Sequence, residues 1–321
     1  MRTQALEVLT MGRALVDFYP TRDGALSVGS RFETSVGGSP TNVAIAASRL
    51  GRRTGVISCI GADPLGLLLL KGLEAEGVDI RGVQVSGDVL TPVAVCEISP
   101  PDDFPLSIYR PAPAADQLID RDKLDSQVIE SANILWMTSS GLSGGIGRDA
   151  HYRALDLRNG NPVIIDLDLR PGFWASEREA KRVIREVLPG MSVAVGNVSE
   201  SKFVTGVAEP HDAALALLDL GVQLAIVKRG PDGVLAKSKD FEMEASPIAV
   251  KIINGIGSGD AFGGALCDGL LAGLDMQQVI EFANAAGALV ASRRGCSTAF
   301  GTRREVEALM GGRESSTPAS S

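Results

Sequence analysis

The sequence predicts an α/β protein with a three-layer αβα fold: a mostly parallel, Rossmann-like central sheet with helices on both faces, and a small antiparallel β lid at its edge. Short β-rich runs alternate with longer helical runs along most of the chain, which is typical of a sheet built from βα units. The segments at about 13–36 and 83–111 break this alternation, because their β patterns have no helix between them. Such strands do not easily join the interior of a parallel sheet, so we assign them to the lid.

The individual elements are predicted from local signals. Residues 6–17 predict an opening strand interrupted by Gly12, and Ser39-Pro40 has the pattern of an N-cap followed by proline at the first helical position. Further strands are predicted at 54–59, 134–137, 163–166, 193–195 and 224–228, and helices at 39–50, 64–75, 148–157, 177–187, 212–220, 259–272 and 277–293. We expect a single domain over 1–310 and a disordered tail over 311–321.

Composition excludes several classes of protein. The 321 residues include 31 basic and 39 acidic side chains, a net charge of −8, and no Lys/Arg run is longer than two, so binding to nucleic acid is not expected. The longest strongly apolar run, 65–70, is far shorter than the roughly 20 residues of a membrane span. The four cysteines form no CxxC pair, and with two histidines they make no zinc pattern. With no signal peptide at the N-terminus, these features predict a cytoplasmic protein with reduced cysteines.

The most informative segment is Asn254-Gly-Ile-Gly-Ser-Gly-Asp-Ala-Phe-Gly-Gly264, in which glycines alternate just before a predicted helix. The backbone amides of Gly257, Ser258 and Gly259 would face an anion at the positive end of that helix. Asp260 would lie beside the anion, where a carboxylate can take a proton from a hydroxyl that attacks a phosphoryl group. The alternative is that Asp260 is a plain N-cap and the glycines only allow close packing.

Two common phosphate-binding motifs are excluded. The chain has no GxxxxGK[ST] sequence, so it is not a P-loop protein. The dinucleotide fingerprint that starts at Gly255 would need glycine at 260, where the chain has Asp260. An NAD-dependent oxidoreductase is therefore not expected.

The residues Gly257-Ser-Gly-Asp-Ala-Phe262 resemble the GAGD signature of the PfkB, or ribokinase-like, carbohydrate kinases. Gly37-Gly-Ser-Pro-Thr-Asn42 resembles the GG-x-x-x-N signature of the same family, and the resemblance extends to about Thr302. It implies transfer of a phosphoryl group from ATP to a sugar hydroxyl, with Mg²⁺ as cofactor. It also implies that Asp260 is the catalytic base and that the amides of Gly257, Ser258 and Gly259 form the anion hole.

The resemblance assigns further residues to the nucleotide. Asn197-Val-Ser-Glu200 resembles the NxxE element, in which Asn197 approaches the nucleotide and Glu200 organises Mg²⁺ through water. Lys228, Gly230 and Gly233 resemble a strand-end turn that borders the nucleotide, and Asn284 lies in a match to the adenine-side helix. Without the resemblance, Glu200 would fit an exposed first-turn glutamate, and Pro231-Asp-Gly233 a hairpin turn. Asn254 departs from the family, which often has Asp there, so activation by a monovalent cation is not implied.

For the sugar, the resemblance makes Asp17 the acceptor of substrate hydroxyls, with Gly37, Gly38 and Asn42 beside it. A carboxylate suits paired hydroxyls because it accepts two charge-assisted hydrogen bonds. The other candidate substrate residues are Tyr109, Arg110, Asp168 and Arg170. Because an arginine fork matches a carboxylate, two arginines at a sugar site suggest a sugar acid. The alternative is that each arginine is a surface or ion-paired group.

The runs 104–110 and 166–174 resemble a PfkB subgroup, the 5-dehydro-2-deoxygluconokinases of inositol catabolism, and the segments 13–20 and 295–299 are similar to that subgroup too. This implies phosphorylation of the primary hydroxyl of 5-dehydro-2-deoxy-D-gluconate. The alternatives are 2-dehydro-3-deoxygluconokinase, then fructokinase, and a non-catalytic sugar or nucleotide sensor on the same fold. Many relatives pair their lids, and uncovered sheet edges favour association, so we expect a homodimer through the lid.

Overall fold

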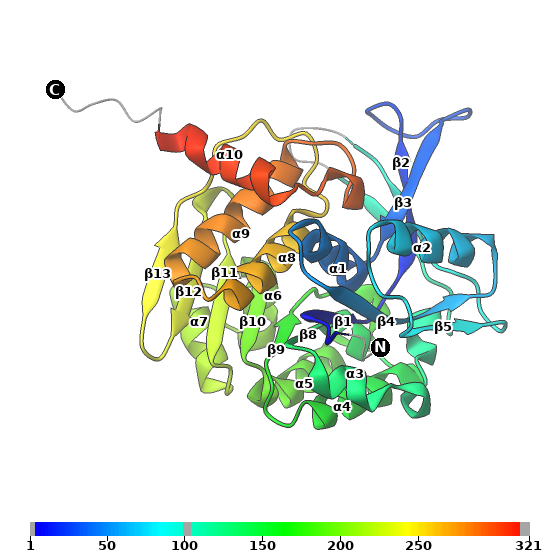
Figure 1. The fold of residues 1–321 in the computed structure, drawn as a ribbon, viewed down its shortest axis with the longest axis horizontal. Helices are drawn as coiled ribbons and strands as arrows, with labels where there is room; N and C mark the ends of the chain where they lie inside the picture. The colour runs from blue at the N-terminus through cyan, green and yellow to red at the C-terminus, as the bar shows by residue number, and fades with distance from the viewer. Residues whose placement is uncertain (1–3, 99–103, 315–321) are drawn as a thin grey trace.

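In the computed structural model of this chain, which describes residues 4–98 and 104–314, the large sheet lies between two layers of helices (Figure 1). Its strands are β1 (Val8–Met11), β4 (Thr54–Gly61), β5 (Val83–Ser86), β8 (Ile134–Thr138), β9 (Val163–Asp166), β10 (Val193–Asn197), β11 (Leu224–Lys228), β12 (Val234–Ser238) and β13 (Glu242–Ala245). Their order is β13-β12-β11-β10-β9-β8-β1-β4-β5, and all neighbours pair in parallel except β11-β12 and β12-β13. The predicted αβα fold with a mostly parallel sheet is confirmed.

The helices cover both faces of this sheet, each face with its own hydrophobic core. One core contains residues of α1 (Ser39–Arg49), α2 (Pro64–Ala75), α8 (Ser258–Ala272), α9 (Met276–Ala291) and α10 (Arg303–Glu314). The other contains residues of α3 (Ser126–Ser131), α4 (Gly145–Arg158), α5 (Glu177–Val187), α6 (Val198–Thr205) and α7 (Pro210–Asp219). Strand β8 supplies both cores alternately, because Ile134 and Trp136 face the first and Leu135 and Met137 the second.

A second, smaller sheet forms the predicted lid and projects from one end of the large sheet (Figure 1). Its order is β3 (Phe32–Gly37), β2 (Leu15–Pro20), β6 (Val93–Cys96) and β7 (Leu106–Tyr109). The outer pairs are antiparallel, whereas the central pair, β2 and β6, is parallel. The predicted lid segment 83–111 is wrong at its start, because Val83–Ser86 pairs with β4 in the large sheet. Residues 99–103 of that segment lie outside the described residues.

The opening strand expected over 6–17 is in fact two strands in different sheets. Strand β1 belongs to the large sheet and β2 to the lid, and Gly12 lies between them with φ of 141°. Residues with a side chain rarely adopt that φ, and a Cβ there would also lie 2.9 Å from Pro40 Cγ. Gly12 therefore lets the chain leave the end of β1 and enter the lid.

Three other expectations need correction. The N-cap of α1 is Gly38, with φ of 101°, and Ser39 is the first helical residue. Helix α10 extends to Glu314, so residues 311–314 are helical and not part of a disordered tail; residues 315–321 lie outside the described residues. The short helices α3 and α6, as well as α10, were not predicted. The assignment of 1–310 to one domain stays a prediction.

Within the described ranges, no helix has the length and apolarity needed to cross a membrane.

Candidate active site

A cavity of about 450 Å³ lies where the lid meets the carboxyl ends of the parallel strands. Asp166, Asn197 and Lys228, the last residues of β9, β10 and β11, line it from the large sheet. Asp17 of β2 and Ile108 of β7 line it from the lid. Ligands of open α/β sheets bind at the carboxyl ends of the strands, so this cavity is the candidate active site.

Asp260, at the end of the glycine-rich loop 254–260, lines this cavity. Helix α8 begins at Ser258, and its N-cap is Gly257, whose φ is 87°. No side chain among the described residues makes a capping hydrogen bond at this helix start. The interpretation of Asp260 as a plain N-cap is therefore wrong. Its carboxylate instead accepts a hydrogen bond of 2.8 Å from Nδ2 of Asn42, on α1. Burial raises the pKa of Asp260 to about 6, although the Asn42 hydrogen bond opposes the shift.

Gly257, Gly259 and Asp260 all line the cavity, so the first turn of α8 faces any ligand there. First-turn amides lack partners within their own helix, which makes them available to an anion. Ser258 does not line the cavity, and its Oγ is buried without a hydrogen-bond partner among the described residues. Asn254 ties this loop to another, because its Nδ2 donates to Gly295 O at 2.8 Å.

Asp17 provides a second carboxyl group in the cavity. It is 5% exposed, and burial together with the nearby Asp260 raises its pKa to about 8, while the positive charge of Arg13 opposes the shift. Gly37, on the neighbouring strand β3, leaves room for it, because a Cβ at that position would overlap the Asp17 carboxylate. Gly38 and Asn42 line the cavity beside Asp17, as predicted for a sugar pocket, whereas Gly37 does not.

A buried group of charges occupies the strand ends. Lys228 Nζ lies 3.7 Å from an Asp166 carboxylate oxygen. Burial alone would lower the pKa of Lys228, but the negative charges of Asp166 and Glu200 raise it. Burial and the nearby Asp166 raise the pKa of Glu200 to about 7. Glu200 is only 9% exposed, so the alternative of an exposed first-turn glutamate is wrong. Its carboxylate accepts a 2.8 Å hydrogen bond from the backbone N of Asn197, which caps α6.

Three residues predicted to contact the nucleotide do not line this cavity. Gly230 and Gly233 form the tight turn between β11 and β12, where the Gly233 N donates to Gly230 O at 3.1 Å. Gly233 has φ of 84°, which favours glycine, so the turn by itself explains this residue. Asn284 of α9 donates from Nδ2 to Ser246 O at 2.9 Å and so holds the loop after β13. Any contact of these residues with a nucleotide stays a prediction.

The two residues proposed to close the lid over the sugar are placed differently from expectation. Tyr109 is 61% exposed and does not line the cavity, because side chains alternate along β7 and Ile108 faces inward. The Arg110 guanidinium forms a bidentate pair with Asp116, at 3.0 and 2.6 Å. Both partners are buried, so the Arg110 fork is already occupied within the protein.

Asp168 and Arg170, by contrast, both line the cavity. Arg170 Nη2 lies 2.7 Å from an oxygen of Asp168, and the Arg170 side chain is 41% exposed. Asp168 also accepts a 2.9 Å hydrogen bond from Ser140 Oγ. Asp168 thus holds protein groups in place, while Arg170 remains accessible from the cavity.

Arg13, which is not among the residues predicted from the sequence to form the site, lines the cavity and is 3% exposed. Its Nη1 donates to Ser140 Oγ at 3.2 Å. The signal that could have identified it is its place directly after the first strand of a doubly wound sheet, since strand ends meet at the ligand crevice. The interruption at Gly12, misinterpreted as a break within one strand, marks that strand end.

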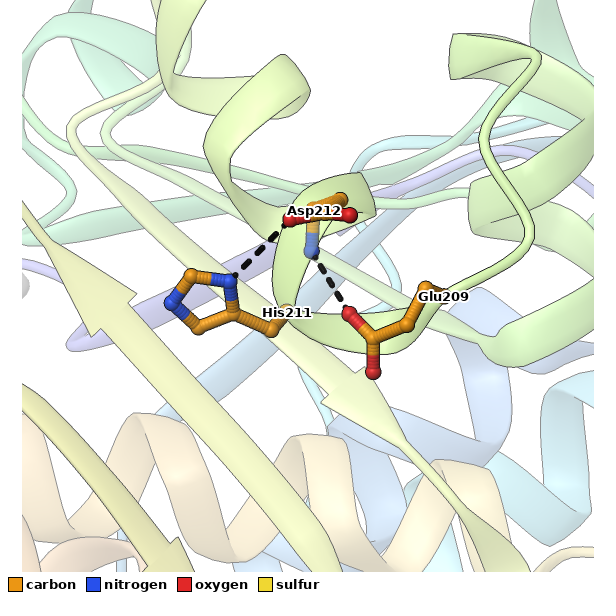
Figure 2. Close-up of side chains that lie close together, drawn as sticks. All are labelled: Glu209, His211 and Asp212. Carbon is orange, nitrogen blue, oxygen red and sulfur yellow. Dashed lines mark hydrogen bonds and ion pairs between the residues drawn. The ribbon is translucent and has the colours of Figure 1, made fainter.

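A separate group of possible metal ligands, Glu209, His211 and Asp212, lies at the start of α7 (Figure 2). Figure 2 shows that these residues bond to one another: His211 Nδ1 lies 3.3 Å from Asp212 Oδ1, and the Asp212 N donates to Glu209 at 3.0 Å. His211 Nε2 also lies 3.0 Å from Glu242. These contacts explain the cluster as a helix start with its cap and ion pairs, and none of its residues lines the cavity.

Residues 5–303 match the family model described as pfkB family carbohydrate kinase. The chain is 29% identical to the 5-dehydro-2-deoxygluconokinase of Clostridium perfringens, over 94% of this chain and 91% of that protein. It is 30% identical to fructokinase-1 of Oryza sativa subsp. japonica, over 94% and 97% of the two chains. The fold resembles that of a "putative Ribokinase II" from E. coli in complex with ATP and Mg²⁺, with a TM-score of 0.86, 25% identity and coverage of 95% of this chain and 99% of that one.

Proposed function

The chain belongs to the pfkB family of carbohydrate kinases, and from this premise we propose that it transfers the γ-phosphoryl group of ATP to the primary hydroxyl of 5-dehydro-2-deoxy-D-gluconate. The observation that carries the proposal is the pair of buried carboxyl groups in one cavity, Asp260 at the start of α8 and Asp17 on the lid. Asp260 lies in the first turn of α8, where helix amides can face a phosphoryl group, and Asp17 is the group that we propose to bind the sugar hydroxyls.

In the proposed reaction, Asp260 accepts the proton of the attacking hydroxyl. The hydroxyl oxygen forms a bond to the γ-phosphorus while the bond from that phosphorus to the bridging oxygen of ADP breaks. The amide of Gly257, the N-cap of α8, and that of Gly259, in its first turn, stabilise the negative charge on the transferred group. Asn42 orients the Asp260 carboxylate through its 2.8 Å hydrogen bond. The lid strands exclude water, which limits hydrolysis of ATP.

ATP and Mg²⁺ as the nucleotide and cofactor are supported by the E. coli structure, which contains both. The donor set of this chain fits Mg²⁺, because the carboxyl groups of Asp166 and Glu200 both line the cavity and could hold the ion, Glu200 through a water molecule. Their mutual proximity helps to keep the pKa of Glu200 raised, at about 7, and a bound cation would relieve that repulsion. When bound, Mg²⁺ would neutralise charge on the phosphates. Asn197 and Lys228 would lie on the phosphate side of the cavity.

A sugar acid as the acceptor is supported by the Clostridium relative and by Arg170, which faces the cavity. A guanidinium attracts a carboxylate more strongly than a neutral hydroxyl. Fructokinase, which the rice relative represents, and 2-dehydro-3-deoxygluconokinase are the alternatives within the same chemistry. A non-catalytic sensor is disfavoured because Asp260 and the glycine loop are both intact.

A substrate panel tests the proposal directly. Purified enzyme is assayed for ADP formation with ATP, Mg²⁺ and, separately, 5-dehydro-2-deoxy-D-gluconate, 2-dehydro-3-deoxy-D-gluconate and fructose. We expect the highest kcat/KM with 5-dehydro-2-deoxy-D-gluconate, because its carboxylate can pair with the arginine side of the cavity. A higher kcat/KM with fructose would contradict the sugar-acid assignment, and no ADP formation with any acceptor would favour the sensor.

We also propose that the lids of two chains pair to form a homodimer. The lid carries exposed apolar side chains, among them Phe32 of β3 and Tyr109 of β7, and Val28 in the connection between β2 and β3 is fully exposed. Exposed apolar groups on a sheet favour association. Sedimentation at micromolar concentration should show a dimer, and the double variant Phe32→Asp/Tyr109→Asp should shift it toward monomer. Phe241→Asp serves as the control, because Phe241 is also an exposed aromatic residue but lies in the turn between β12 and β13, outside the lid. This variant should remain a dimer. A wild-type monomer would contradict this proposal.

A further inference from the structure

Three arginines and two aspartates meet at one corner where the lid joins the large sheet. The guanidinium groups of Arg13 and Arg110 lie over the ring of Phe173, 5.0 and 4.3 Å from its centroid. Arg110 pairs with Asp116, and Arg170 pairs with Asp168. Of these three arginines, Arg13 alone has no carboxylate oxygen within hydrogen-bond distance among the described residues.

The under-paired cation is Arg13. Its Nη2 lies 3.9 Å from Asp168, beyond hydrogen-bond distance, whereas Arg170 approaches the same carboxylate to 2.7 Å. A guanidinium has five N–H donors, and Arg13 uses one of them on Ser140 Oγ. Its Nε has no hydrogen-bond partner among the described residues, as is also true of the Nε of Arg170, so what distinguishes Arg13 is the longer distance to Asp168. A buried charge with so few partners is costly unless something else pairs with it.

Arg13 also lies in the same cavity as Asp17, so that it can contact a carboxylate of a substrate bound there. It lines the cavity that contains Asp17, and its positive charge lowers the pKa of that residue. A hydroxyl group bound to Asp17 and an anionic group bound to Arg13 can therefore belong to one small molecule. Burial lowers the pKa of Arg13 itself, which is the desolvation cost that an anionic partner would offset.

We infer that Arg13 is a specificity-determining residue that binds the carboxylate of the sugar-acid substrate, in the role that the sequence suggested for Arg110. This inference rests on the proposed function, because it needs an acidic substrate. Arg110 is unsuited to the role, since both of its fork nitrogens already bond to Asp116. Asp168 and Ser140 act as positioning residues that hold the Arg13 guanidinium.

The test compares kcat/KM for 5-dehydro-2-deoxy-D-gluconate and for fructose in the wild type and in Arg13→Lys. Lysine keeps the charge but cannot form the two-pronged contact with a carboxylate. We expect kcat/KM for the acid to fall about ten- to hundredfold, the range for losing a charge-assisted hydrogen bond. The value for fructose should fall much less. The matched control is Arg148→Lys, since Arg148 also lies over an aromatic ring, that of Trp174, but does not line the cavity. In Arg148→Lys, kcat/KM should stay at the wild-type value for both substrates.

The outcomes separate this inference from the proposed function. If the wild type prefers fructose, the proposed function fails. If the wild type prefers the acid but Arg13→Lys lowers kcat/KM equally for both substrates, Arg13 is structural and the inference alone is overturned. If Arg13→Lys does not fold, Ser140→Ala provides the test, because Nη1 of Arg13 donates to that hydroxyl. Losing the hydrogen bond should lower the acid-to-fructose ratio about fivefold, and an unchanged ratio would again overturn the inference.

Discussion

Replacing Asp260 by asparagine is expected to lower kcat by about 10²–10⁴-fold, the usual contribution of a positioned general base. Asparagine has nearly the same shape as aspartate but cannot accept the proton of the attacking hydroxyl. ATP affinity should change little, because the helix amides that face the phosphates remain. The measurement is steady-state turnover with saturating substrates, together with ATP binding by titration calorimetry. Turnover close to that of the wild type would remove Asp260 from the role of base.

The pH dependence of turnover gives an independent check on the same residue. Burial raises the pKa of Asp260 to about 6, so the carboxyl holds its proton at higher pH than usual. The base must be deprotonated to act, and turnover of the wild type should therefore fall as the pH drops below about 6. The residual activity of Asp260→Asn should lack this dependence. A wild-type profile that is flat through this pH range would contradict the assignment.

Replacing Asp268 by alanine is expected to produce the largest loss of stability. Asp268 lies on α8 and is fully buried. Arg52 Nε approaches its carboxylate to 2.7 Å, and Arg303 of α10 pairs with the other oxygen. Removing the carboxylate takes a shared partner from two guanidinium groups, of which Arg52 keeps its 3.1 Å pair with Glu7; breaking a buried pair costs about 3–5 kcal/mol. Since Arg303 is partly exposed and can be rehydrated, we expect the lower end of this range.

Urea denaturation of wild type and Asp268→Ala measures the change in the free energy of unfolding. Glu186→Ala is the matched control, because Glu186 also pairs with an arginine, Arg182, but at an exposed position on α5. Exposed pairs contribute little, so that variant should differ from the wild type by about 0.5 kcal/mol or less. A similarly small change for Asp268→Ala would show that the network does not hold α8 and α10 together.

The sequence by itself determined the fold class and most of the glycine-rich loop at 254–260, because both depend on short-range features of the chain. The alternation of strands and helices predicted the parallel sheet, and strand ends such as Asp166 and Lys228 placed polar groups at one edge of it. The glycine before Asp260 predicted the start of a helix, and the structure has that start at Ser258. The two signatures around Gly38 and Gly257 were enough to identify the family.

Other features could not be predicted, because they depend on how distant segments meet. The sequence offered Arg110 and Arg170 as equivalent cations, but Arg110 is neutralised by Asp116 in the folded chain. The break at Gly12 was interpreted as an interruption of one strand, although the predicted lid begins at about residue 13; only the structure shows that β1 and β2 belong to different sheets. Glu200 matched an exposed helix start equally well until the neighbouring strand ends buried it.

The same limit applies to the charged side chains that line the cavity. Arg13 meets Ser140 and Asp168, which are more than a hundred residues away in the sequence. Asp17 and Asp260, from the lid and from α8, are likewise brought into one cavity only by folding. Whether a charged side chain is paired, buried or free for a ligand depends on desolvation and on the distances to such partners. Local sequence patterns determine the elements and the reaction class, whereas the position of Arg13 in the cavity and the raised carboxyl pKa values arise only in the tertiary structure.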